Sequence, residues 1–187
     1  MKIAITGGIG SGKSYVCRLL AERGIEVYDC DAAAKRLMRS SMALRTALIR
    51  LVGPDVYVGD VLQKRVMAQF LLADEHNAEA VNDVVHPAVA RDFMSSGIDW
   101  IESAILFDSG FDRRITLDRV VCVTAPTEVR ISRIMARDGI SRSQALQWIG
   151  RQLPQDEVAR RSQHIIENDG MKSLSQQIDN ILNQIYN

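Results

Sequence analysis

The hydrophobic positions of this chain follow two different periods. Short runs that are apolar throughout, or that alternate with polar residues, predict β-strands, whereas longer segments with an apolar residue every third or fourth position predict helices. The expected strands cover residues 3–6, 25–31, 100–108, 119–124 and 165–167. Because strands and helical segments alternate along the chain, we expect an α/β fold in which five strands form a doubly wound parallel sheet.

One long segment between the second and third expected strands departs from this alternation. It contains the turn Gly53-Pro54-Asp55 and a further proline, Pro87, both of which are expected to interrupt helices. No convincing buried strand occurs there, and we expect residues 32–96 to form a helical insertion. Its apolar positions have helical spacing at residues 32–38, 42–52, 61–73 and 78–94.

A second helical excursion is expected after the fourth strand. Asp138-Gly139 breaks one helix, and Ser141 with Gln144 forms the capping box of the next. A basic helix-turn-helix of this kind can close over a nucleotide as a lid. We therefore expect one domain that consists of a core at 1–31, 97–136 and 153–187, a helical acceptor-binding insertion at 32–96 and a lid at 137–152.

Charge and composition argue against several classes of protein. Twenty-three basic residues balance 23 acidic residues, so neither a nucleic acid nor an anionic membrane surface is expected as a partner. No apolar run approaches the roughly 18 residues of a membrane span, and the chain opens directly on the first strand. Cys17, Cys30 and Cys122 are odd in number and far apart, which favours reduced structural thiols over a disulfide framework. We expect a cytoplasmic protein.

Candidate chemistry is concentrated in the segment that follows the first strand. Residues 7–14 have the pattern G-x-x-x-x-G-K-S between an apolar strand and a helical segment, which predicts a phosphate-binding P-loop. Its glycines let backbone N–H groups point at phosphate oxygens, Lys13 would reach the β- and γ-phosphates, and Ser14 would ligate Mg²⁺. A glycine-rich turn without a ligand is the alternative, but the flanking strand and helix favour the P-loop.

Acids close two of the other expected strands. Asp29 and Asp31 end the second strand, at the edge of a parallel sheet where ligands bind. They are therefore expected to face the phosphates, unless one of them caps the helix that begins near Ala32. Asp108 ends the third strand in a weak Walker B pattern.

Three arginines share one face of the helix after the fourth strand. Arg130, Arg133 and Arg137 lie at positions i, i+3 and i+7. Such a stripe is ordinarily solvated, but beside a P-loop it is a candidate clamp for a phosphoryl group. The chain has no N-K-x-D motif for guanine and is short for a motor ATPase. A small-molecule kinase is favoured, with a nucleotide-dependent binding switch as the alternative from another class.

From the first strand to the last, the sequence resembles the dephospho-coenzyme A kinases. The resemblance implies transfer of a phosphoryl group from MgATP to the ribose 3′-hydroxyl of dephospho-coenzyme A, the last step of coenzyme A synthesis. A kinase for another small metabolite or nucleotide is the alternative among enzymes. The segments that carry the resemblance are Thr6–Ser14, Asp29–Asp31, Leu62–Arg65, His86-Pro87, Ile105–Asp108, Arg133–Asp138 and Ile165–Gly170.

Particular roles for residues follow from this resemblance. Asp31 would be the base for the 3′-hydroxyl, Lys13 and Arg137 would serve the phosphates, and Arg65 and His86 would lie on the acceptor side. The residues expected to bind ATP are Gly8, Ile9, Gly10, Ser11, Gly12, Lys13, Ser14, Tyr15 and Asn168. The sequence departs from the family pattern at Tyr15, Cys30, Lys35, Ala104 and Gln163.

Overall fold

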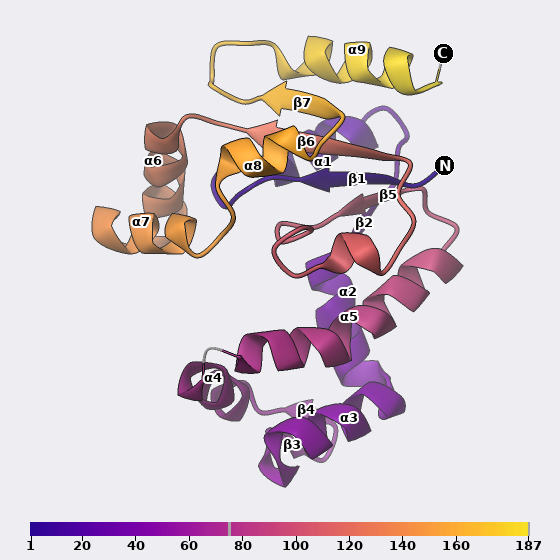
Figure 1. Cartoon of the computed structure of the whole chain (residues 1–187), viewed down its shortest axis with the longest axis vertical. Coiled ribbons are helices and arrows are strands. Elements are labelled where there is room, and N and C mark those ends of the chain that lie inside the picture. The colour runs from indigo at the N-terminus through magenta and orange to yellow at the C-terminus, as the bar shows by residue number, and fades with distance from the viewer. Residues whose placement is uncertain (75, 187) are drawn as a thin grey trace. The chain divides into compact units, whose positions relative to one another are not determined.

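The structure, a computed structural model, describes residues 1–74 and 76–186 (Figure 1). These residues form two compact units. The sheet unit comprises Met1–Tyr28, Ile98–Asp112 and the chain from Thr116 onward, and the helical unit comprises Asp29–Gly97 and Arg113–Ile115.

A five-stranded parallel sheet forms the centre of the sheet unit, as the hydrophobic pattern predicts. Its strand order is β2-β5-β1-β6-β7. The central strand β1 lies parallel to both neighbours, with Ile3 opposite Trp100 on one side and Arg119 on the other. The strands are β1 (Ile3–Thr6), β2 (Val27–Asp29), β5 (Trp100–Glu102), β6 (Arg119–Thr124) and β7 (His164–Glu167).

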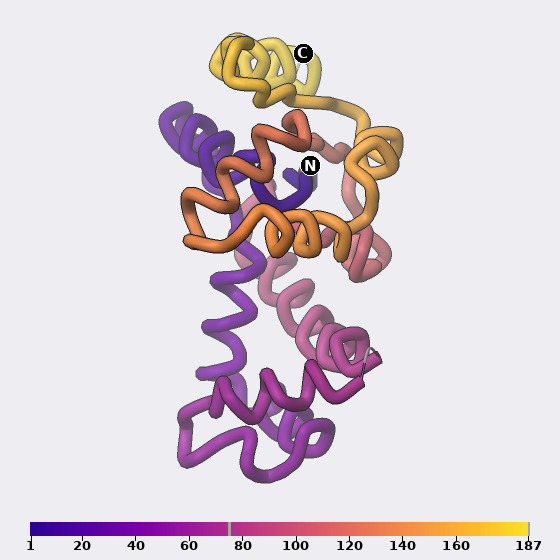
Figure 2. Tube along the Cα trace, turned by 90° about the vertical axis from the view of Figure 1, so that its left-hand side faces the viewer, coloured from indigo at the N-terminus to yellow at the C-terminus, as the bar shows by residue number. Residues whose placement is uncertain are grey.

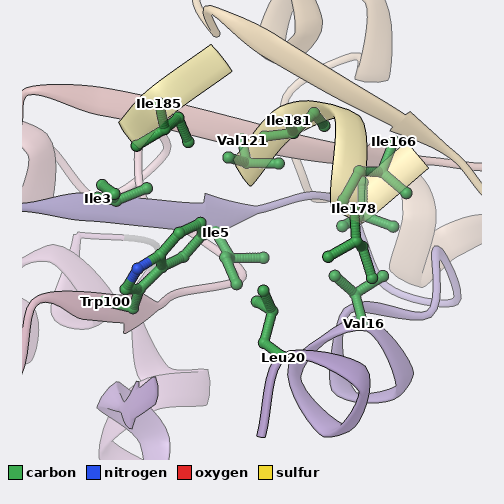
Figure 3. Packing of buried hydrophobic residues seen from close by; sticks show 11 residues of the cluster. Ile3, Ile5, Val16, Leu20, Trp100, Val121, Ile166, Ile178, Ile181 and Ile185 are labelled. Carbon is green, nitrogen blue, oxygen red and sulfur yellow. The ribbon is translucent and has the colours of Figure 1, made fainter. Parts of the chain in front are cut away.

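Helices α1 and α9 cover one face of this sheet. Figure 3 shows side chains of both helices meeting Ile3 and Ile5 of β1. Because these strands are buried between helical layers, their sequences are apolar throughout rather than alternating. The helices of the sheet unit are α1 (Lys13–Ala21), α6 (Thr127–Asp138), α7 (Arg142–Gly150), α8 (Gln155–Arg160) and α9 (Leu174–Tyr186).

Helices α6 and α7 form the predicted helix-turn-helix, and Figure 2 shows the chain running out along α6 and back along α7. α6 ends at Gly139, whose φ of 66° lies in the left-handed region. Ser141 then begins α7 with the expected capping box to Gln144. Ile131 and Ile134 of α6 pack against Ala145 of α7, which holds the two helices together.

The helical unit is built on the packing of α2 and α3 against the long helix α5. Val85, Val89 and Phe93 of α5 are buried, with exposed fractions of 5% or less. A two-stranded antiparallel hairpin lies between α3 and α4. The elements are α2 (Cys30–Ser40), α3 (Met42–Val52), the 3₁₀ turn η1 (Pro54–Val56), β3 (Tyr57–Val58), β4 (Val61–Leu62), α4 (Lys64–Ala73) and α5 (Asn77–Ser95).

Several boundaries differ from the sequence prediction. The second sheet strand, expected to reach Asp31, ends at Asp29, and α2 begins at Cys30. Val61 and Leu62 belong to strand β4 rather than to a helix. α5 continues through Pro87, because apolar residues on both sides of the proline are buried by the same neighbouring helices. The third sheet strand ends at Glu102, and residues 104–110 form turns. Leu106 is nevertheless fully buried, so the apolar run to Asp108 marks a buried loop rather than a longer strand.

Cys17, Cys30 and Cys122 form no disulfide in the described part of the chain, and Cys30 and Cys122 are buried. Burial in β6 raises the pKa of Cys122 to about 11, so this thiol stays protonated at neutral pH. Within residues 1–74 and 76–186, none of the helices combines the length and apolar character needed to span a bilayer.

Candidate functional site: a phosphate-binding loop and an acidic helix start

The glycine-rich loop joins β1 to α1 in the sheet unit. Gly10 and Gly12 have φ angles of 79° and 95°, in the left-handed region where glycine has no steric penalty. A Cβ at Gly12 would also overlap the side-chain amide of Asn168, so larger residues are excluded there. α1 begins at Lys13 without a side-chain cap on its first N–H groups. This geometry is that of an anion site at a helix N-terminus.

Lys13 is folded back onto the loop. Its ammonium Nζ donates a hydrogen bond of 2.6 Å to the carbonyl oxygen of Gly7 and lies 3.8 Å from Oε1 of Glu102. The side chain of Lys13 is only 9% exposed, and that of Glu102 is 17% exposed. The nearby carboxylate therefore compensates a largely buried positive charge at the end of β5. Glu102, and not the predicted Asp108, is the strand acid beside the P-loop lysine.

Two of the three arginines on α6 hold the loop from outside. Nε of Arg130 donates to the carbonyl oxygen of Ile9 at 2.9 Å, and Arg130 is 4% exposed. Burial lowers the pKa of Arg130, although an arginine remains charged at neutral pH. Arg133 donates to the carbonyl oxygens of Gly10 and Ser11 at 3.4 and 3.3 Å. These contacts hold the carbonyl groups of Ile9, Gly10 and Ser11 in fixed positions, which shapes the backbone of the loop.

Asn168, which follows β7, completes this support. Its Nδ2 donates to the carbonyl oxygen of Ser11 at 2.8 Å, and its Oδ1 accepts from Arg133 at 3.1 Å. Asn168 is 7% exposed. Its side-chain hydrogen bonds run to the loop backbone and to α6, so Asn168 shapes the phosphate loop from behind.

A contact between the loop and the end of the lid was not foreseen from the sequence. The backbone N–H of Ile9 donates to Oε1 of Gln152 at 2.7 Å. The side chain of Ile9 also packs against the apolar cluster of α6 and α7. Gln152 ends the expected lid at 137–152, but no local pattern links it to Ile9, which lies 143 positions away.

The remaining predicted phosphate residues are more exposed. Ser14 lies in the first turn of α1 with an exposed side chain, and Tyr15 is 47% exposed beneath the guanidinium of Arg18. Arg137 pairs with the adjacent Asp138 at 2.7 Å, which raises the pKa of Arg137. Arg137 thus shares a helix with Arg130 and Arg133 but does not share their contacts with the loop. Asp108 accepts a hydrogen bond from the backbone of Leu153 at 2.6 Å.

In the helical unit the two acids after β2 have different roles. Asp29 is the N-cap of α2, and its Oδ1 accepts from the N–H of Ala32 at 2.9 Å. This confirms the capping alternative for one of the acids. Asp31 lies in the first turn of α2 with an exposed side chain. A carboxylate there is stabilised by the positive end of the helix dipole and can accept a hydrogen bond from a ligand.

His86 occupies a partly buried position in the middle of α5. Its burial, assisted by the positive charge of Arg114, lowers its pKa, while Asp83 and Asp31 act in the opposite direction. The imidazole is consequently neutral at pH 7. Arg65, the other predicted acceptor residue, lies in the first turn of α4 with an exposed side chain.

Comparison with known proteins agrees with this geometry. A sequence model described as dephospho-CoA kinase matches residues 1–173. The chain belongs to the dephospho-CoA kinase family. The dephospho-CoA kinase of Bacteroides fragilis is 39% identical over 193 residues, covering 100% of this chain and 93% of that protein.

Solved structures extend the likeness to the fold. The crystal structure of TT1252 from Thermus thermophilus superposes with a TM-score of 0.83 at 33% identity, covering 100% of this chain and 98% of the other. The dephospho-CoA kinase of Campylobacter jejuni gives a TM-score of 0.67 at 19% identity, covering 99% and 98%. The family resemblance and the α/β P-loop kinase fold expected from the sequence are confirmed.

Proposed function

We propose that this dephospho-CoA kinase family member transfers the γ-phosphoryl group of MgATP to the ribose 3′-hydroxyl of dephospho-coenzyme A. The products are coenzyme A and ADP. The observation that carries this proposal is the phosphate loop, whose backbone is held open by Arg130 and Arg133 and whose lysine is positioned by Glu102. Together with membership of the family, this loop supports phosphoryl transfer rather than binding of a phosphate alone.

The sheet unit supplies the groups for the phosphates. The N–H groups at the start of α1 and the ammonium of Lys13 would stabilise negative charge on the transferring group. Lys13 is folded onto the Gly7 carbonyl, so its ammonium would exchange that contact for phosphate oxygens. Arg137 would add a further positive charge from the lid side of α6. Its position at the end of that helix suits a group that acts when the lid closes.

Asp31 is assigned the role of general base. A ribose hydroxyl is a poor nucleophile at neutral pH, so a carboxylate must orient it and accept its proton while the bond to phosphorus forms. The exposed carboxylate of Asp31 is suited to this task, whereas that of Asp29 is engaged as a helix cap. Arg65 and His86 are assigned to acceptor binding, with His86 acting as a neutral hydrogen-bonding group.

Mg²⁺ is part of the proposal, and the residues around the loop fit it. The exposed hydroxyl of Ser14 at the start of α1 would be an oxygen ligand, and Glu102 would provide a carboxylate at the end of β5. Groups of three or more metal-ligating side chains do not occur in the described part of the chain. Mg²⁺ in kinases takes few protein ligands and several phosphate oxygens or waters, so the proposed ion would arrive with the nucleotide. When bound, it would neutralise charge on the phosphates.

The test is ADP release measured with and without dephospho-coenzyme A, combined with identification of the product by mass. A kinase should release ADP only when the acceptor is present and should add one phosphate to it. ADP release that does not depend on the acceptor would support the nucleotide-dependent switch instead. Activity with a different small hydroxylated acceptor, and none with dephospho-coenzyme A, would change the substrate but keep the enzyme class.

A further inference from the structure

A hollow in the helical unit lies between α2 and the β3–β4 hairpin. We call it the hairpin pocket. Its volume is about 550 Å³, which falls in the ordinary range for small-molecule sites. It is lined by Lys35, Met38 and Arg39 of α2 and by Asp60, Val61, Leu62 and Lys64 of the hairpin region.

Several contacts hold the walls of the hairpin pocket in place. The hydroxyl of Tyr57 on β3 donates to the carbonyl oxygen of Met38 on α2 at 2.8 Å. Arg45 of α3 pairs with Asp60 in the hairpin turn at 2.6 Å, and its guanidinium lies 5.3 Å from the ring centre of Tyr57. The pocket is therefore built from fixed elements within one unit, and the charge of Asp60 is already compensated.

The chemistry of the lining is mixed. Lys35, Arg39 and Lys64 give it three positive charges, whereas Val61 and Leu62 give it an apolar wall. Val61 is 65% exposed, so its side chain is accessible to a ligand in the pocket. A matching ligand would carry neighbouring negative charges and a partly apolar extension.

The residues of α2 that line the hairpin pocket lie on the same helix as Asp31, the proposed base. Asp31, Lys35 and Met38 are spaced i, i+4 and i+7, so they lie on one face of α2. With a rise of about 1.5 Å per residue, Lys35 lies roughly 6 Å and Arg39 roughly 12 Å beyond Asp31 along the helix axis. An acceptor whose hydroxyl meets Asp31 and whose body follows α2 would therefore bring its next groups to Lys35.

We propose that the hairpin pocket binds the 5′-diphosphate and the adjoining flexible arm of the acceptor. Lys35 and Lys64 bind the diphosphate, and Val61 and Leu62 contact the apolar part of the arm. This inference rests on the proposed function, because the ligand class is that of dephospho-coenzyme A. It makes Lys64, whose side chain lines the pocket, a stronger candidate than Arg65 for the acceptor phosphates.

A second basic hollow in the same unit provides the competing location. It has a volume of about 660 Å³ and is lined by Pro87, Ala90, Arg91, Met94, Ser95, Arg113 and Arg114. Arg114 is engaged with Asp83, and the lining includes no residue of α2. Three residues of α2, on the helix that carries Asp31, line the hairpin pocket, and we therefore favour the hairpin pocket.

The experiment compares charge reversals at matched positions. Lys35→Glu and Lys64→Glu are each expected to raise the dissociation constant of dephospho-coenzyme A about tenfold or more, because a charge-assisted contact is lost. The KM for ATP and the kcat at saturating acceptor should change less than about twofold. Arg50→Glu makes the same charge change at an exposed position of α3 that does not line the pocket. The dissociation constant of dephospho-coenzyme A, the KM for ATP and the kcat should all stay unchanged in this variant.

A second variant tests the apolar wall. Val61→Asn alters an exposed side chain, so the fold should persist, as thermal melting would verify. It should weaken binding of dephospho-coenzyme A severalfold but leave binding of ADP, which lacks the arm, unaffected. Equal effects on both ligands would assign Val61 to general packing and overturn this part of the inference.

The outcomes separate the two proposals. If the wild-type protein forms no phosphorylated product from dephospho-coenzyme A, the proposed function fails. If the wild type is active but Lys35→Glu and Lys64→Glu bind the acceptor normally, only the hairpin pocket fails. A large loss of acceptor binding in Arg91→Glu, without one in the Lys35 and Lys64 variants, would move the diphosphate to the second basic hollow.

Discussion

The candidate binding groups of the two units are of different kinds. In the sheet unit the phosphate loop presents backbone N–H groups, and buried side chains such as Arg130 and Asn168 hold the loop from behind. In the helical unit the candidate acceptor residues, including Asp31, Lys35 and Lys64, are exposed side chains on helix surfaces. A phosphate has a fixed shape that a rigid backbone can match, whereas a long flexible acceptor requires side chains distributed along its length.

In the sheet unit, we expect the largest loss of phosphoryl transfer at Lys13. Lys13→Ala removes the ammonium that would neutralise charge on the transferring phosphoryl group. We expect phosphoryl transfer to fall by roughly 10³-fold, at the upper end of the loss seen when one electrostatic donor is removed. The measurement is coupled ADP release with dephospho-coenzyme A as acceptor. Lys172→Ala, which removes an exposed lysine of the same unit, is the matched control and should retain normal turnover.

Loss of activity in Lys13→Ala must be separated from loss of structure. Lys13 is largely buried, so the variant should be compared with the wild type by thermal melting and by its circular dichroism spectrum. A folded variant without turnover supports the P-loop assignment. Near-normal turnover would show that the loop does not act on the transferring group.

The proposed base gives an effect of comparable size. Asp31→Asn keeps the shape of the side chain but cannot accept a proton, and general-base help is typically worth about 10²- to 10⁴-fold. We expect phosphoryl transfer to fall within that range, with a much smaller change in ATP binding. Asp29→Asn is the matched control, because asparagine also caps helices well, and it should have little effect. A larger loss from Asp29→Asn than from Asp31→Asn would move the base to Asp29.

Lys13 in the P-loop and the pair Asp29 and Asp31 show how much of the site could be predicted from the sequence. The P-loop was predictable because its function depends on consecutive residues between a strand and a helix, and the five-stranded sheet was predictable because its strands are buried and apolar. Asp29 and Asp31 were found as a pair, but the sequence left open which of them is the cap. That distinction depends on where β2 ends, and strand ends are set by packing rather than by local pattern.

Other parts of the site were beyond the sequence for a physical reason. Glu102 and Gln152 contact the P-loop from positions about 90 and 140 residues away, so no local motif joins them. An acid at the end of an otherwise apolar strand was the only available signal for Glu102. Similarly, the sequence pattern predicts a helix at Val61 and Leu62, because a strand of two residues is too short to show the alternating hydrophobic pattern of a strand.

Two arginines of α6, Arg133 and Arg137, are expected to have different kinetic roles within the sheet unit. Arg133 contacts the loop and Asn168, so Arg133→Ala should disorder the phosphate site and raise the KM for ATP roughly tenfold. Arg137 lacks those contacts and pairs with Asp138. Arg137→Ala should instead lower kcat, also roughly tenfold, with little change in the KM for ATP, since a group that engages on closure acts on the transition state.

Steady-state kinetics with ATP varied at saturating acceptor would distinguish these roles. Thermal melting adds an independent measurement, because only Arg133→Ala should lower the melting temperature appreciably. If Arg137→Ala raised only the KM for ATP, Arg137 would be a binding residue, and the proposed action of the lid would be wrong.

The smallest expected effect lies in the helical unit, at His86. Burial lowers the pKa of His86 below the usual value of about 6.5, so between these two values the unfolded chain binds a proton that the folded protein does not. Stability should therefore fall as the pH decreases through this window and level off below the lowered pKa. His86→Gln removes the titration. The melting temperature of the variant should consequently decrease less than that of the wild type between pH 7 and pH 5, by roughly a degree or two because His86 is only partly buried.

Asp31→Asn gives a second test of the pKa of His86 by melting temperature as a function of pH. The carboxylate of Asp31 acts to raise the pKa of His86, so its removal should lower that pKa further and enlarge the loss of stability on acidification. The double variant Asp31→Asn/His86→Gln should lose this additional pH dependence. Identical slopes of melting temperature against pH in the wild type and His86→Gln would mean that His86 titrates normally, and the imidazole would then be partly charged near neutral pH. Its proposed role as a neutral group in acceptor binding would have to be abandoned.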